Sequence, residues 1–125
     1  MIKTLTNYEI YTYAHLLAAA FSDAEQRLPV KVNFPVQKNK ATLLQLAQEI
    51  EQSRLKIAQA YGTFDPETQQ FMFSEENREV ASNELEELQR MLQEVSIMTI
   101  KYDNLDENLI LSAGQMEALM FMIED

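Results

Sequence analysis

The sequence predicts a mainly helical α+β fold, in which about four helices pack around a small antiparallel sheet. Apolar residues recur every three or four positions over long stretches, and serine or threonine capping signals precede several of these stretches. Two shorter segments have the alternating or β-branched pattern of strands. No linker, repeat or low-complexity segment divides the sequence, so we expect one domain over residues 1–125.

The first helix is expected from Thr6 to about Ser22. Thr6 and Glu9 have the spacing of a capping box, and Leu5 and Ile10 have the spacing of a hydrophobic staple. The expected buried stripe of this helix consists of Ile10, Tyr13, Ala14, Leu17 and Phe21.

Residues 28–36, "LPVKVNFPV", alternate between apolar and other residues, which predicts a strand with one buried face. Proline has no N–H to donate to a neighbouring strand, so Pro29 and Pro35 place this strand at a sheet edge. The expected buried face consists of Leu28, Val30, Val32, Phe34 and Val36.

A basic rim follows from this strand. Lys31, Asn33, Lys38 and Lys40 are expected along one exposed edge that leads into the second helix. One interpretation is that these lysines pair with the acidic second half of the chain, internally or across a dimer. The other is that the rim is the contact surface for a partner.

The middle of the chain predicts a long helix, a hairpin and a third helix. The second helix is expected over 39–61, with Asn39 as its N-cap and Gly62 at its exit. A short hairpin is expected within 63–73, and Ser74 is expected to cap the third helix. A second strand is expected over 95–102.

The last helix is expected to begin after Ser112, which forms a capping box with Gln115. Its apolar residues cover more than one side, so we expect burial on two sides or contact with another subunit. Met120 and Phe121 are therefore candidate contact residues.

The charge is unevenly distributed. The formal net charge is -10; residues 1–62 carry seven Lys/Arg against five Asp/Glu, and residues 63–125 carry three against fifteen. Such acidity disfavours direct nucleic-acid binding. No stretch of about 18 apolar residues is present, which predicts a cytoplasmic protein without a membrane partner.

An acidic face is expected on the third helix, formed by Glu75, Glu76, Glu79, Glu84 and Glu87. The string "EENRE" resembles the E-E-x-x-E motif of all-helical nucleotide pyrophosphatases, which hold Mg²⁺. That family also needs a downstream E-x-x-D on a facing helix, and the nearest match, Asp103 with Asp106, departs from it. We therefore expect a solvated helix face, no metal site, no cofactor and no enzyme activity; mimicry of a nucleic acid is the alternative for this face.

Several strings resemble a family of small, uncharacterised phage and prophage proteins of Gram-positive bacteria. These strings are "NYEIYTYA", "LPVKVNFPVQKNK", "LAQEIEQSRLKIAQAYG" and "SAGQMEALMFMIED". The resemblance implies a phage origin and a location in the host cell cytoplasm, and it brings no catalytic residues.

The sequence thus favours a non-enzymatic phage accessory protein that binds a host or phage protein, with inhibition of a host defence protein as one version. The alternative is an oligomeric structural or assembly factor of the virion. A Mg²⁺-dependent nucleotide hydrolase that uses Glu75, Glu76 and Glu79 is the third hypothesis.

The hydrolase hypothesis has a direct test. Incubation of the protein with nucleoside triphosphates and Mg²⁺ is expected to release no phosphate or pyrophosphate, measured by a coupled colorimetric assay. A turnover that Glu76→Ala abolishes would show that the acidic string is catalytic.

Overall fold

A computed structural model of the chain describes residues 1–23, 25–105 and 109–124. Its helices are α1 (Asn7–Ala20), α2 (Val30–Tyr61), α3 (Glu75–Arg90) and α4 (Ala113–Leu119), with short 3₁₀ turns at Tyr102–Asn104 and Met120–Met122. Its strands are β1 (Ile2–Thr6), β2 (Gly62–Asp65), β3 (Gln70–Phe73), β4 (Leu92–Ser96), β5 (Ile100–Lys101) and β6 (Ile123–Glu124). The predicted mainly helical α+β class is confirmed.

The strands form pairs rather than one central sheet. Among the described residues, β1 pairs with β4 and β2 with β3, both antiparallel, and β5 pairs with β6 in parallel. Each pair contributes at most five residues per strand, so the helices carry most of the packing.

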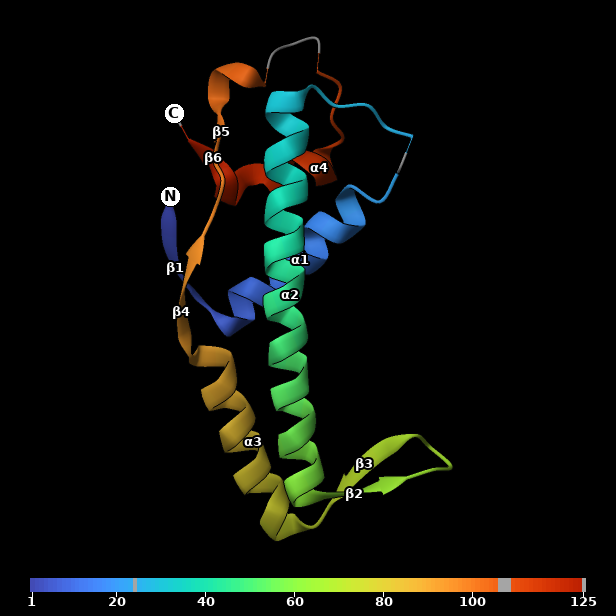
Figure 1. Cartoon of the computed structure of the whole chain (residues 1–125). Coiled ribbons are helices and arrows are strands. Elements are labelled where there is room, and N and C mark those ends of the chain that lie inside the picture. Colours follow the sequence, from blue (N-terminus) through green and yellow to red (C-terminus); the bar gives the residue numbers. More distant parts are fainter. Residues whose placement is uncertain (24, 106–108, 125) are drawn as a thin grey trace.

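Helix α2 is the spine of the molecule (Figure 1). With 32 residues it is about 48 Å long at the usual rise of an α-helix. Helices α1 and α4 and the pairs β1–β4 and β5–β6 surround its N-terminal half, whereas α3 runs beside its C-terminal half and the β2–β3 hairpin projects to one side. The molecule therefore has a broad end with a core and a narrow two-helix stalk.

The prediction of a strand over 28–36 is wrong, because α2 begins at Val30 and continues through Pro35. Burial follows a helical spacing of four, at Val32 and Val36, and the alternating residues Val30 and Phe34 are 78% and 56% exposed. Pro29 occupies the N-cap position, where its fixed φ suits the helix entry. Pro35 removes one helical hydrogen bond near this end, and the cooperative helix that follows offsets the loss.

Asn39 is not an N-cap but an interior residue of α2 that is 1% exposed. Its side-chain Nδ2 donates to the Met98 carbonyl at 2.7 Å, and its Oδ1 accepts from the Met98 N–H at 2.8 Å. The amide thus forms hydrogen bonds with both the N–H and the carbonyl of Met98, which lies between β4 and β5. This double hydrogen bond attaches the strands to the spine.

The start of the chain combines a confirmed cap with a strand that the sequence analysis missed. Thr6 Oγ1 accepts from the Glu9 N–H at 3.0 Å, and the Thr6 N–H donates to the Glu9 carboxylate at 3.0 Å, which confirms the capping box. Before it, β1 pairs with β4, with Thr4 opposite Glu94. The β-branched residues in "IKTLT" were the available signal for this strand.

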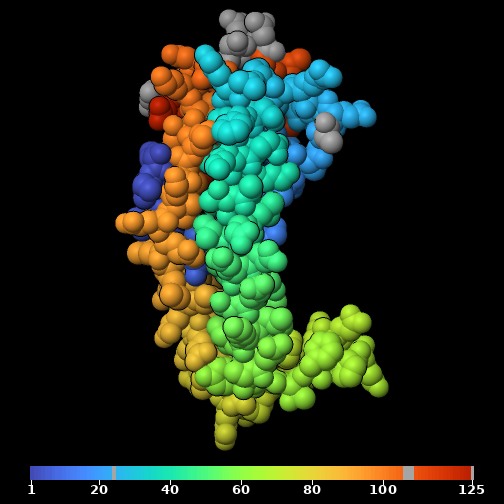
Figure 2. Space-filling view, in the orientation of Figure 1, coloured from blue at the N-terminus to red at the C-terminus, as the bar shows by residue number. Residues whose placement is uncertain are grey.

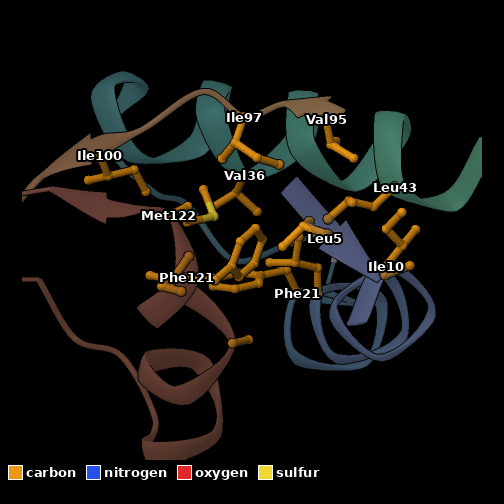
Figure 3. Packing of buried hydrophobic residues seen from close by; sticks show 14 of the residues in the cluster. Leu5, Ile10, Phe21, Val36, Leu43, Val95, Ile97, Ile100, Phe121 and Met122 are labelled. Atoms are coloured by element: carbon orange, nitrogen blue, oxygen red, sulfur yellow. The ribbon is translucent and has the colours of Figure 1, made fainter. Parts of the chain in front are cut away.

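The buried core lies at the broad end (Figure 3). Residues of α1, α2, β4 and the C-terminal segment converge there, and Ile10, Val36, Val95 and Met122 are among its labelled members. The stalk is thinly packed by comparison. Beyond Ala47, helix α2 buries one apolar residue, Ala58, and helix α3 buries one, Ala81. Local stability is therefore expected to fall from the broad end to the stalk tip.

The predicted hairpin and third helix are confirmed. Strands β2 and β3 place Phe64 opposite Phe71, and Ser74 caps α3 by accepting from the Asn77 N–H. The predicted strand over 95–102 is replaced by two shorter strands, β4 and β5, separated by three residues that include Met98. Between them the chain bends to meet Asn39.

The last segment departs from the expected single helix. The capping box of Ser112 and Gln115 is confirmed, but α4 ends at Leu119 and the chain continues through a 3₁₀ turn into β6. Leu119, Phe121 and Met122 are buried within the chain, and Met120 is 70% exposed. The apolar residues thus cover several sides because the chain changes direction. No helix in the described ranges has the length and apolarity that a bilayer span requires.

Asn39→Ala is expected to lower the free energy of unfolding by about 2–4 kcal/mol, because it leaves the N–H and carbonyl of Met98 without their partner. Urea denaturation measures this change, with Asn33→Ala on the same helix as the control. A loss below about 0.5 kcal/mol would show that the bridge contributes little.

Candidate protein-binding groove

Helices α1, α2 and α3 enclose an open groove of about 600 Å³, called here the three-helix groove. Most of the surface that lines it is apolar. Its lining residues are Asn7, Tyr8, Tyr11, His15, Leu44, Ala47, Gln48, Ile50, Glu51, Arg54, Leu85, Leu88 and Gln89.

The α1 wall of the groove is aromatic. Tyr8, Tyr11 and His15 are spaced by three and four residues, so they lie on one side of the helix. Tyr8 is 61% exposed and Tyr11 is 43% exposed, and the rings of Tyr11 and His15 are in contact at a centroid distance of 4.1 Å. Since α1 buries Ile10 and its neighbours on another side, the tyrosines remain available at the surface.

The α2 floor is aliphatic and is bounded by an ion pair. Leu44, Ala47 and Ile50 form the floor. Beyond them, Arg54 donates from Nε and from its terminal nitrogen to the Glu51 carboxylate at 2.9 and 2.5 Å. This hydrogen bonding holds the pKa of Glu51 below its usual value. The pair marks the end of the apolar floor toward the stalk tip.

The α3 wall is fixed in place by Asn7. The Asn7 side chain donates to the Leu88 carbonyl at 2.8 Å, and its backbone N–H donates to the Met91 carbonyl at 2.9 Å. Gln93 completes the cluster by donating to Asn7 Oδ1 at 2.7 Å. These bonds satisfy carbonyls at the end of α3 that the helix itself leaves without partners. The start of α1 and the end of α3 are thereby held together, which sets one boundary of the groove.

The predicted acidic face is divided between several sides of α3. At 3.6 residues per turn, Glu75, Glu79 and Glu86 lie on the flank beside the groove residue Gln89 and away from α2. Glu84 lies on the α2 side instead, where it accepts a hydrogen bond from the Tyr61 hydroxyl at 2.8 Å that raises the tyrosine pKa. Glu76 and Glu87 fall on the remaining, solvent-exposed side.

The predicted basic rim is also divided. Because α2 is helical, residues seven apart share a side, so Lys31 lies with Lys38 and Asn33 lies with Lys40 on the opposite side. The expectation of one continuous rim was wrong, since it assumed an extended chain.

Lys31 lines a second, shallower depression of about 520 Å³. Val30, Phe34, Met98 and Lys101 lie around it. Lys31 and these residues, together with Lys38 about two turns beyond Lys31 on the same side of α2, are called here the basic patch.

Of the two C-terminal candidates, only Met120 is at the surface. Phe121 is buried and stacks on Tyr13 with a centroid distance of 4.4 Å and an interplanar angle of 7°. The Lys3 ammonium donates to the Phe121 carbonyl. Phe121 is thus placed to stabilise the core rather than to touch a partner.

Within residues 1–23, 25–105 and 109–124, no three His, Cys, Asp or Glu side chains gather as a metal site. Glu75, Glu76 and Glu79 are exposed at the start of α3, and Asp103 belongs to a 3₁₀ turn. Asp106, the other half of the candidate motif, lies outside the described residues.

Comparisons with protein-family models, with curated proteins and with solved structures gave no match. The surface of the molecule is therefore where its candidate function is found. The sequence analysis missed the aromatic wall, although Tyr8, Tyr11 and His15 were outside the expected buried stripe of the first helix. These three ring side chains on the polar side of the helix could have indicated a binding surface from the sequence alone.

The double substitution Tyr8→Ala with Tyr11→Ala is expected to change the free energy of unfolding by less than about 1 kcal/mol, because both rings are largely exposed. Tyr13→Ala on the same helix is expected to cost about 3 kcal/mol, because it removes the stack on Phe121. Thermal or urea denaturation followed by circular dichroism measures both. Equal losses would mean that the two groove tyrosines are structural.

Proposed function

We propose that the protein is a non-enzymatic accessory protein that binds a helical segment of another protein in the three-helix groove. The observation that carries the proposal is the exposed aromatic wall of Tyr8 and Tyr11 opposite an aliphatic floor. Grooves between helices commonly bind the apolar side of an amphipathic helix. Tyrosines are frequent anchors of such contacts because they bury a large area at low entropic cost.

The electrostatics favour a basic partner segment. Glu86 lies beside the groove residues Leu85 and Gln89, although Arg90 pairs with it at 2.6 Å, and Glu75 and Glu79 lie on the same side of α3 nearer the stalk tip. Opposite charge on the partner would increase the association rate and fix the orientation of its helix. The expected ligand therefore combines leucine-like residues at helical spacing with lysine or arginine on one flank.

The resemblance to phage and prophage proteins supports a partner in an infected bacterial cell. Under this proposal the protein acts in the host cytoplasm on a host or phage protein. Inhibition of a host defence protein is the most specific version of this proposal. When the groove binds a helix of the defence protein, it covers the part of that protein's surface that contains the helix.

An assembly role in the virion is the second candidate, and one observation favours it. The β2–β3 hairpin projects from the stalk (Figure 2), and its residues Phe64 and Met72 are more than half exposed. Projecting apolar arms suit contacts between repeated subunits. The nucleotide-hydrolase hypothesis has less support, because no second carboxylate group joins Glu75, Glu76 and Glu79 in the described part of the chain.

Photo-crosslinking tests the groove directly. A benzoylphenylalanine placed at Tyr11 is expected to capture a basic, helix-forming peptide from infected-cell lysate, identified by mass spectrometry. The same group at Gln45, which is exposed and lies opposite the groove on α2, serves as the control. Acidic peptides, or the same peptides from both positions, would contradict the proposal.

The captured peptide is then synthesised and titrated by calorimetry. Tyr8→Ala with Tyr11→Ala is expected to weaken binding at least about tenfold, which corresponds to roughly 1.4 kcal/mol. Added salt is expected to weaken binding further if the acidic flank contributes. Unchanged affinity in the double variant would exclude the groove as the binding site.

A further inference from the structure

The two ends of α2 carry opposite charge. Residues 26–48, which include its N-terminal part, hold four Lys/Arg and no Asp/Glu. Residues 62–79, which follow its C-terminus and include the hairpin and the start of α3, hold five Asp/Glu and one Arg. The spine thus connects a basic segment to an acidic one.

These ends cannot neutralise each other within one molecule. The α2 helix is continuous, so its rise places Lys31 about 45 Å and Lys38 about 35 Å from Tyr61 at the acidic end, whereas charges are screened beyond about 8 Å at physiological ionic strength. The ion pairs found among the described residues, Glu51–Arg54 and Glu86–Arg90, each lie within one helix. The lysines of residues 26–48 therefore do not pair with the carboxylates of residues 62–79 within one molecule.

Both ends also expose apolar side chains. In the basic patch, Val30 and Phe34 lie around a depression that, among the residues the structure describes, is lined by two lysines and no carboxylate. At the acidic end, the hairpin exposes Phe64 and Met72 and projects away from the helices (Figure 2). A two-stranded hairpin alone is marginally stable in water, so a covering surface would stabilise it.

We infer that two copies of the chain pair antiparallel along α2, so that the hairpin of each copy lies on the basic patch of the other. The antiparallel orientation brings Lys31 and Lys38 near the carboxylates at the hairpin and the start of α3, including Glu75 and Glu79. A parallel orientation would place like charges together. Two identical contacts related by a twofold axis also close the assembly at two subunits.

Charge-reversal variants test the inference. One variant carries Lys31→Glu with Lys38→Glu, and the other carries Glu75→Lys with Glu79→Lys. Size-exclusion chromatography with light scattering at about 100 mM salt is expected to give twice 14.5 kDa for the unmodified chain and 14.5 kDa for each variant alone. An equimolar mixture of the variants is expected to regain twice 14.5 kDa, because every contact in the mixed pair again joins opposite charges.

Lys40→Glu with Arg90→Glu is the matched control, because it changes the net charge by the same amount at positions outside the basic patch, with Lys40 on the opposite side of α2 from Lys31 and Arg90 at the end of α3. This control is expected to remain a dimer, as is Tyr8→Ala with Tyr11→Ala, which separates self-association from partner binding in the groove. A monomeric unmodified chain, or a mixture that stays monomeric, would overturn the inference. A mass that keeps rising with concentration would show an open head-to-tail chain and would overturn the closed pair.

Discussion

The side-chain amide of Asn39 is the interaction on which the rest of the structure depends. It lies inside the spine helix and meets both backbone groups of Met98, so it determines where the strands attach to α2. Two further buried amides act in the same way. Asn7 joins the start of α1 to the end of α3, and Gln115 donates to the Ala20 carbonyl at 2.9 Å, which connects α4 to α1. Buried amides with satisfied hydrogen bonds favour one arrangement of the helices over others that apolar contacts alone would permit.

The distribution of packing separates stability from recognition. The core at the broad end buries residues of every layer, whereas the stalk buries little more than Ala58 and Ala81. The start of α3 and the hairpin belong to regions with few buried neighbours, whereas the exposed rings Tyr8 and Tyr11 lie on the outer side of α1, whose other side is in the core. Such surfaces can be covered by another protein without disturbing the core. The stalk is also the part whose local opening a bound partner would suppress most.

The successes and failures of the sequence analysis have a common physical origin. The caps at Thr6, Ser74 and Ser112 were predicted because they depend on side chains three residues away. The prediction of a strand over 28–36 was wrong. Apolar residues at positions 30 and 34 fit a strand as well as a helix, and the sequence alone does not show that Val30 and Phe34 are exposed. The same error joined Lys31 and Lys40 into one rim. The groove was missed because its walls come from three helices far apart in the sequence.

The sequence by itself determined the local features of this protein: the helix starts, the hairpin, the mainly helical class and the unequal charge of its two halves. Each follows from residues within a few positions or from composition. Only the tertiary structure decided that α2 runs unbroken through Pro35, that Asn39 faces Met98, and that the basic and acidic segments lie at opposite ends of a rigid helix. Those facts depend on contacts between distant residues, and a linear pattern does not contain them.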